Sequence, residues 1–199
     1  MKVGVSGGIG SGKSSVCKVF GTLGIPVFEA DEEARKITES DEGVKKSLCE
    51  IAGTDLYISG SLDRKLLASL IFNNRSMLKE VNRLVHPMVF QAFGEWAGKQ
   101  DAPYVIMEAA ILFESGAYNL VDKTIVVTAP DEERLERVSS RSGMTISEVS
   151  ERMRNQHSQD ELAGRADYVI KNGDKDLILP AIIEIHKDLL KRSKTNRYG

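Results

Sequence analysis

The first fifteen residues constrain the fold of this chain more than any other stretch. Met1–Ser6 is an apolar, β-branched run of strand length, and the residues after it fit the phosphate-binding pattern G-x-x-x-x-G-K-S/T. A helix-compatible stretch, Val16–Leu23, follows the pattern. The fixed positions are occupied by Gly7, Gly12, Lys13 and Ser14.

The residue types of this loop suit a nucleoside triphosphate. Glycines allow positive φ values, so that successive N–H groups can point at an anion, and the following helix adds its N-terminal donors. Lys13 can reach the β- and γ-phosphates, and the Ser14 hydroxyl can bind Mg²⁺. The alternative is a glycine-rich turn with a chance Lys-Ser. The candidate nucleotide-binding residues of the loop are Gly8, Ile9, Gly10, Ser11, Gly12, Lys13, Ser14 and Ser15.

The bulk composition fits one α/β domain. The chain has 199 residues, is 41% hydrophobic and has a formal net charge of -2, so its overall charge does not favour nucleic acid or an anionic membrane. No apolar run approaches the roughly 20 residues that span a bilayer, and no signal peptide is visible. Cys17 and Cys49 lack the paired spacing of a metal site. We therefore expect a cytoplasmic protein without nucleic-acid or membrane partners.

A second short strand ends at an acidic residue. Val27–Ala30 precedes Asp31, and a strand, helix and strand of this length form a unit with parallel strands. The carboxyl ends of parallel strands lie at one edge of the sheet, where ligands bind, so we expect Asp31 beside the phosphate loop. The alternative is that Asp31 caps a helix that starts near Glu32.

Residues 32–97 have a mostly helical pattern and are too many for a simple crossover between strands. We expect an inserted helical subdomain that could hold a second substrate. Ser61 is a candidate helix cap, and Pro87 is expected to kink or restart its helix. On the residues alone, His86 favours a structural role.

One further acidic residue stands at the end of a predicted strand. Glu108 follows a buried strand at its carboxyl end and could hold Mg²⁺ directly or through water, or could be a solvated strand end. Asn172-Gly173 is a predicted turn before an amphipathic closing helix, on which His186 is expected to be exposed. The three predicted strands are Tyr104–Met107, Thr124–Thr128 and Ala166–Ile170.

An arginine-rich helical hairpin precedes the last strand. Helices are predicted from Pro130 to Arg141 and from Ser147 to about Gln156. Such arginines are most often a solvated helix face, but a hairpin placed here also resembles a mobile lid whose guanidinium groups stabilise a transferring phosphoryl group. Spacing does not decide which arginine does so. The five arginines are Arg134, Arg137, Arg141, Arg152 and Arg154.

Together these elements predict an α/β, three-layer P-loop NTPase fold with a five-stranded parallel sheet, a helical insertion and a helical lid. We expect one domain over residues 1–199. Its nucleotide-binding core would comprise 1–31, 101–134 and 164–199, the acceptor subdomain 32–100, and the lid 135–163.

The ordered set of motifs resembles the dephospho-coenzyme A kinase family over nearly the whole chain. Glu29 stands where the family's Asp-Ala-Asp motif begins with Asp, and Ala110 stands where Pro is usual. The matching segments are Gly4–Ser14, Glu29–Asp31 with Ala34-Arg35, His86-Pro87, Glu108–Glu114, Arg141, Arg152, Asn155-Gln156, Ala166–Ile170 and Asn172-Gly173.

The resemblance implies ATP- and Mg²⁺-dependent phosphorylation of the ribose 3′-hydroxyl of dephospho-CoA by a monomer or weak homo-oligomer. Lys13, Asp31 and Arg141 would be catalytic, with Asp31 orienting the 3′-hydroxyl and accepting its proton, and Ser14 holding the metal. Further roles follow by analogy. Asn172 and Gly173 would lie near adenine, His86 would bind the acceptor, and Glu108 would support the metal or the acceptor ribose.

Two other functions stay open at this point. A kinase for another hydroxylated acceptor or for a nucleotide would have the same phosphate-side residues. A nucleotide-operated switch is disfavoured, because the chain has no Asn-Lys-x-Asp sequence and no Asp-x-x-Gly after a strand.

Overall fold

The computed structural model describes residues 1–72, 74–154 and 156–195. Asn155, which belongs to the lid pattern quoted above, and residues 196–199 of the basic tail lie outside the described residues. The chain divides into two compact units, residues 1–29 with 99–199, and residues 30–98. Each unit is described by itself.

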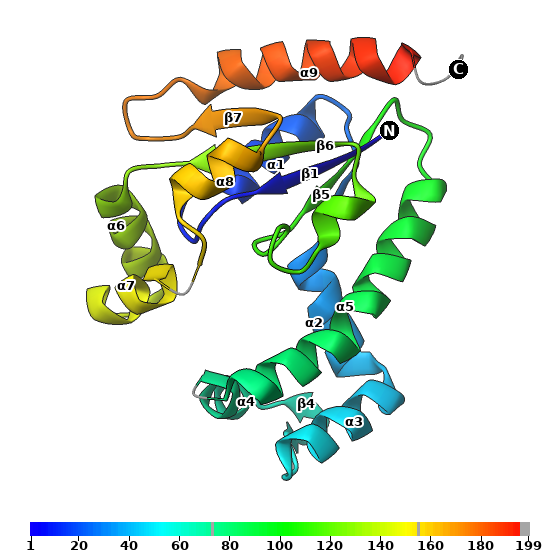
Figure 1. Ribbon diagram of the computed structural model, residues 1–199, viewed down its shortest axis with the longest axis vertical. Helices are drawn as coiled ribbons and strands as arrows, with labels where there is room; N and C mark the ends of the chain where they lie inside the picture. The colour runs from blue at the N-terminus through cyan, green and yellow to red at the C-terminus, as the bar shows by residue number, and fades with distance from the viewer. Residues whose placement is uncertain (73, 155, 196–199) are drawn as a thin grey trace. The chain divides into compact units, whose positions relative to one another are not determined.

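The first unit is built on a parallel sheet of five strands in the order β2-β5-β1-β6-β7 (Figure 1). This confirms the predicted fold class and places β1 at the centre, next to β5 and β6. Glu29 at the end of β2 pairs in register with Glu108 at the end of β5. The strands are β1 (Lys2–Ser6), β2 (Val27–Glu29), β5 (Val105–Glu108), β6 (Lys123–Thr128) and β7 (Tyr168–Lys171).

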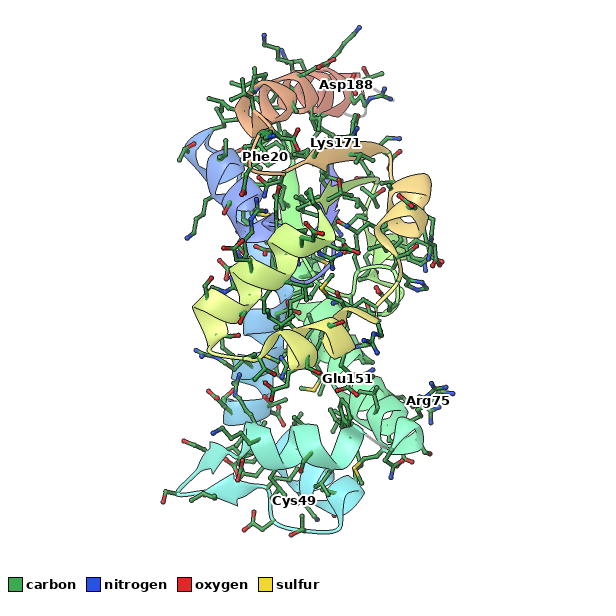
Figure 2. All side chains as sticks on the ribbon, turned by 90° about the vertical axis from the view of Figure 1, so that its left-hand side faces the viewer. Phe20, Cys49, Arg75, Glu151, Lys171 and Asp188 are labelled. Atoms are coloured by element: carbon green, nitrogen blue, oxygen red, sulfur yellow. The ribbon has the colours of Figure 1, made fainter. Side chains whose placement is uncertain are left out.

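Helices and loops cover the two faces of this sheet. Val3 and Val5 of β1 belong to the buried cluster that includes α1 and α9, whereas the intervening Gly4 faces Leu112 and Val121. Phe20, fully buried on α1, lies close below α9 in Figure 2. The alternation follows from the two-residue period of a strand. The helices of this unit are α1 (Lys13–Thr22), the 3₁₀ helix η1 (Ala117–Leu120), α6 (Asp131–Ser142), α7 (Ile146–Arg154), α8 (Gln159–Arg165) and α9 (Ile178–Thr195).

Several local predictions for this unit need correction. The first helix begins at Lys13 rather than Val16, directly after the glycine loop. Helix α8 has no counterpart among the helices predicted from the sequence. His186 is not exposed as expected, because its Nδ1 lies 2.6 Å from the hydroxyl of buried Tyr104. That bond gives a buried phenol the partner it needs.

The second unit is helical with a small hairpin. The buried residues Val81, Val85, Val89 and Phe93 form one stripe along α5, as expected for a helix with one packed face. Figure 1 shows α2, α3, α4, α5 and β4 of this unit. Its elements are α2 (Ala30–Ser40), α3 (Glu42–Ala52), β3 (Tyr57–Ile58), β4 (Ser61–Leu62), α4 (Arg64–Phe72) and α5 (Arg75–Gly98).

The second unit differs from the predictions at Ser61 and, in part, at Pro87. Ser61 lies in β4, and α4 is capped instead by Asp63, whose carboxylate accepts the Leu66 N–H at 2.9 Å. Pro87 lies within α5 and does not restart the helix, and the other expected outcome, a kink, stays a prediction. The alternative in which Asp31 caps a helix near Glu32 does not hold, because α2 already begins at Ala30. Among the described residues, no helix is long and apolar enough to cross a membrane.

Candidate nucleotide-binding site

The phosphate loop connects β1 to α1 as its glycines predict. Gly12 has φ of 91°, a left-handed conformation that disfavours any side chain. A Cβ at Gly12 would also overlap the amide nitrogen of Asn172. At Gly7, with φ of 150°, a Cβ would overlap the Val127 carbonyl oxygen of β6. The loop is therefore packed against its neighbours in a shape that only glycine permits at these positions.

Lys13, the first residue of α1, folds back over the loop. Its Nζ donates to the Gly7 carbonyl at 2.9 Å and lies 3.5 Å from the Gly8 carbonyl. These bonds hold the ammonium along the loop, where it can meet a phosphate. The next residue, Ser14, is the predicted metal residue and points elsewhere.

Ser14 contacts the acid at the end of β5. Its Oγ donates to Glu108 Oε1 at 2.7 Å, and both residues line a cavity of about 470 Å³ beside α1. A hydroxyl and a carboxylate are oxygen donors of the kind that Mg²⁺ takes together with substrate phosphates. Within 1–72, 74–154 and 156–195, no group of three His, Cys, Asp or Glu residues could hold a metal ion. As two oxygen donors, Ser14 and Glu108 fit a cation that shares its coordination with a bound phosphate.

Cys17 lies in the same cavity and stays a thiol. Burial raises the pKa of Cys17, and the nearby Glu108 carboxylate raises it further. A thiol held protonated is a poor nucleophile. Cys17 is thus a small buried residue of α1 and not a reactive group.

Arg134 is the residue that the sequence could not single out. It is only 4% exposed, and its Nε donates to the Ile9 carbonyl at 2.9 Å while Nη1 donates to Asp131 at 2.8 Å. A Cβ at Gly8 would overlap the guanidinium. Burial lowers the pKa of Arg134 and Asp131 partly offsets this, but an arginine stays charged at neutral pH. A fixed positive charge therefore lies against the phosphate loop.

Asn172 holds the loop from the other side. Its side-chain Nδ2 donates to the Ser11 backbone carbonyl at 2.8 Å. The backbone carbonyl of Asn172 accepts from Arg137 Nη1 at 2.8 Å. Arg137 also pairs with Glu133 at 3.0 Å. Gly173 follows, with its N–H bonded to Asp176 at 2.8 Å. The structure thus ties Asn172 to the loop, and its proximity to adenine stays a prediction.

Three further predicted residues, Arg141, Asp31 and His86, are described by their own surroundings. Arg141 lies exposed near the end of α6, with no ionic partner among the residues that the structure describes. Asp31 and His86 belong to the second unit and are placed within it only. Asp31 is exposed in the first turn of α2. His86 stacks on Phe90 with ring centroids 6.0 Å apart, and burial lowers its pKa.

The chain is similar to proteins of one family over most of its length. A family model described as dephospho-CoA kinase matches residues 1–176. A dephospho-CoA kinase of Bacteroides fragilis is 37% identical over 186 residues, covering 93% of this chain and 91% of that protein.

Two solved structures are also similar. A crystal structure from Thermus thermophilus has a TM-score of 0.82 and 35% identity, covering 96% of this chain and 97% of that one. The dephospho-CoA kinase from Campylobacter jejuni has a TM-score of 0.67 and 28% identity, with coverage of 98% and 100%.

Proposed function

The chain belongs to the dephospho-CoA kinase family, and we propose that it transfers the γ-phosphoryl group of ATP to the ribose 3′-hydroxyl of dephospho-CoA. The products are CoA and ADP. The observation that carries the proposal is the phosphate loop between β1 and α1, with Lys13 folded over it, in a chain that matches the family over residues 1–176.

The phosphate side of the reaction uses residues of the first unit. Backbone N–H groups of the loop and Lys13 bind the triphosphate, and Arg141 adds positive charge to the transferring group. Ser14 and Glu108 would hold Mg²⁺, which neutralises phosphate charge when bound. The Ser14–Glu108 hydrogen bond supports this assignment, because it brings the two oxygen donors together.

The acceptor side rests on Asp31 and the helical unit. The ribose 3′-oxygen bonds to the γ-phosphorus as the bond to the β–γ bridging oxygen breaks, and the proton of the hydroxyl passes to the Asp31 carboxylate. We assign acceptor binding to residues 32–100, with His86 among the binding residues. The exposure of the Asp31 side chain supports its availability to a substrate.

The proposed cellular compartment and binding partners are those expected from the sequence. The described cysteines, Cys17 and Cys49, are free, which supports a reducing compartment such as the cytoplasm. The proposed partners are dephospho-CoA and ATP, without nucleic acid, and the proposed state is a monomer or weak homo-oligomer.

Acceptor specificity tests the proposed function directly. ADP release is measured with Mg-ATP and dephospho-CoA, adenosine, AMP or shikimate, and the product is weighed by mass spectrometry. We expect turnover with dephospho-CoA alone and the addition of one phosphate. Turnover only with another acceptor would overturn the substrate assignment. The Lys13→Ala variant, which should lose triphosphate binding or turnover, is the control for the loop.

A further inference from the structure

Both backbone polar atoms of Ile9, in the middle of the phosphate loop, are hydrogen-bonded to side chains of the arginine-rich helical hairpin, residues 130–156. The Ile9 carbonyl accepts from Arg134 Nε at 2.9 Å. The Ile9 N–H donates to Gln156 Oε1, also at 2.9 Å. Arg134 lies on α6, and Gln156 follows α7. The two ends of the helical hairpin therefore contact one residue of the loop.

The two bonds differ in their consequence for a ligand. A backbone carbonyl oxygen only accepts hydrogen bonds, so it cannot bind a phosphate oxygen. The bond between Arg134 and the Ile9 carbonyl therefore does not compete with nucleotide binding. An N–H of the phosphate loop is a donor that an anion needs. The Gln156 amide oxygen therefore accepts the hydrogen bond of the Ile9 N–H, a donor that a bound phosphate would also need.

Gln156 also has space to leave the loop. It lines a cavity of about 770 Å³ together with Arg134, Met153, Arg154 and His157. A glutamine side chain has three rotatable torsions and can turn into such a space, whereas Arg134 is 4% exposed and fixed by Asp131. Displacement of Gln156 would thus free the Ile9 N–H while Arg134 keeps the Ile9 peptide in place.

We propose that Gln156 is a positioning residue that acts as a latch. In the absence of nucleotide, its side chain holds the end of the helical hairpin against the phosphate loop. When phosphate binds, Gln156 is displaced from the Ile9 N–H. The proposal rests on the proposed function, since it needs a nucleotide in the loop. It couples nucleotide binding to release of residues 156–158, which lead into α8.

Two substitutions of Gln156 have opposite expected effects. Gln156→Ala removes the competitor for the Ile9 N–H, so Mg-ADP and a non-hydrolysable Mg-ATP analogue should bind roughly 2- to 10-fold tighter, the range of one net hydrogen bond. Gln156→Glu keeps an acceptor on the Ile9 N–H with a charge-assisted bond and repels phosphate, so both nucleotides should bind more weakly. Glu184→Ala, on an exposed residue of α9, is the control and should leave the affinity unchanged.

The state of the Ile9 N–H gives a second readout. Amide hydrogen exchange is followed by NMR on protein labelled with ¹⁵N-isoleucine, and the Ile9 signal is assigned with Ile9→Val. Without nucleotide, we expect Ile9 to exchange faster in Gln156→Ala than in the wild type. Mg-ADP should shift the Ile9 signal, and adenosine, which lacks phosphate, should not.

The outcomes separate the latch from the proposed function. Weaker or unchanged nucleotide binding by Gln156→Ala would overturn the latch, as would an Ile9 signal that Mg-ADP does not move. If Gln156→Ala does not fold, Gln156→Glu and the wild-type Ile9 signal decide. A wild type that binds Mg-ADP but does not phosphorylate dephospho-CoA would overturn the proposed function and leave the latch standing.

Discussion

The Ser14 hydroxyl donates a 2.7 Å hydrogen bond to the Glu108 carboxylate, and so joins the first turn of α1 to the last residue of β5. The two residues are 94 positions apart in the sequence. The parallel pairing of β1 with β5 brings their carboxyl ends to one edge, where the phosphate loop begins.

If this pair holds the metal, Glu108→Gln should raise the Mg²⁺ concentration for half-maximal turnover. Gln keeps an acceptor for Ser14 but loses the charge that Mg²⁺ prefers, so we expect a shift of roughly 10- to 100-fold. The measurement is initial rate against Mg²⁺ at saturating ATP. Glu184→Gln, on an exposed face of α9, is the control. An unchanged Mg²⁺ dependence would remove Glu108 from the metal site.

Asp31→Asn should separate binding from chemistry. Asparagine has similar size but cannot take the proton of the acceptor hydroxyl, so kcat should fall roughly 10²- to 10⁴-fold while binding of a non-hydrolysable ATP analogue stays the same. Steady-state kinetics and calorimetry give the two quantities. Glu184→Gln, on an exposed face of α9, controls for the loss of one carboxylate charge. Normal kcat in Asp31→Asn would contradict the assignment.

Arg141→Ala should lower kcat without affecting the fold. Arg141 lies exposed on α6, so the free energy of unfolding should change by no more than about 0.5 kcal/mol. An arginine that stabilises a transferring phosphoryl group is worth about 10³-fold or more in kcat. The measurements are urea unfolding and steady-state rates, with Lys187→Ala, exposed on α9, as control. A kcat within twofold of the wild type would exclude Arg141 from catalysis.

Gly12 and Asn172 should be energetically coupled. Gly12→Ala meets both left-handed strain and overlap with the Asn172 amide, so we expect a loss of about 2–4 kcal/mol in the free energy of unfolding. Asn172→Ala removes the overlapping atoms, so the double variant should lose less than the sum of the single variants. Urea unfolding of the four proteins measures this coupling. Additive losses would show that the two residues do not meet.

The Tyr104–His186 pair should make stability depend on pH. Burial lowers the pKa of His186 in the folded protein, so protonation favours the unfolded chain. The stability that this residue contributes is present above the unfolded pKa of about 6.5 and is lost as pH falls below it. His186→Gln should therefore show a smaller loss of stability than the wild type between about pH 6.5 and 5. Equal losses in thermal unfolding would contradict this.

Local patterns in the sequence were enough for the phosphate loop and the sheet. Gly7–Ser14 requires a strand before it and a helix after it, and both are present as β1 and α1. Short apolar runs predicted the five parallel strands, because a strand buried on both faces leaves an unbroken apolar signal. Helix ends were less predictable, as Ser61 shows. Its hydroxyl could cap a helix, but the chain pairs it in β4 and Asp63 takes the cap.

The chemistry of the loop can be read from neighbouring residues, because their spacing along the chain sets their contacts. The distant side chains that hold the loop are brought to it by folding, so local patterns do not identify them. Arg134 and Asn172 reach Ile9 and Ser11 across 125 and 161 positions, and five arginines in one hairpin are equivalent by spacing. Arg134 differs from the others because folding buries it against a backbone carbonyl, and a buried guanidinium must find partners for its donors.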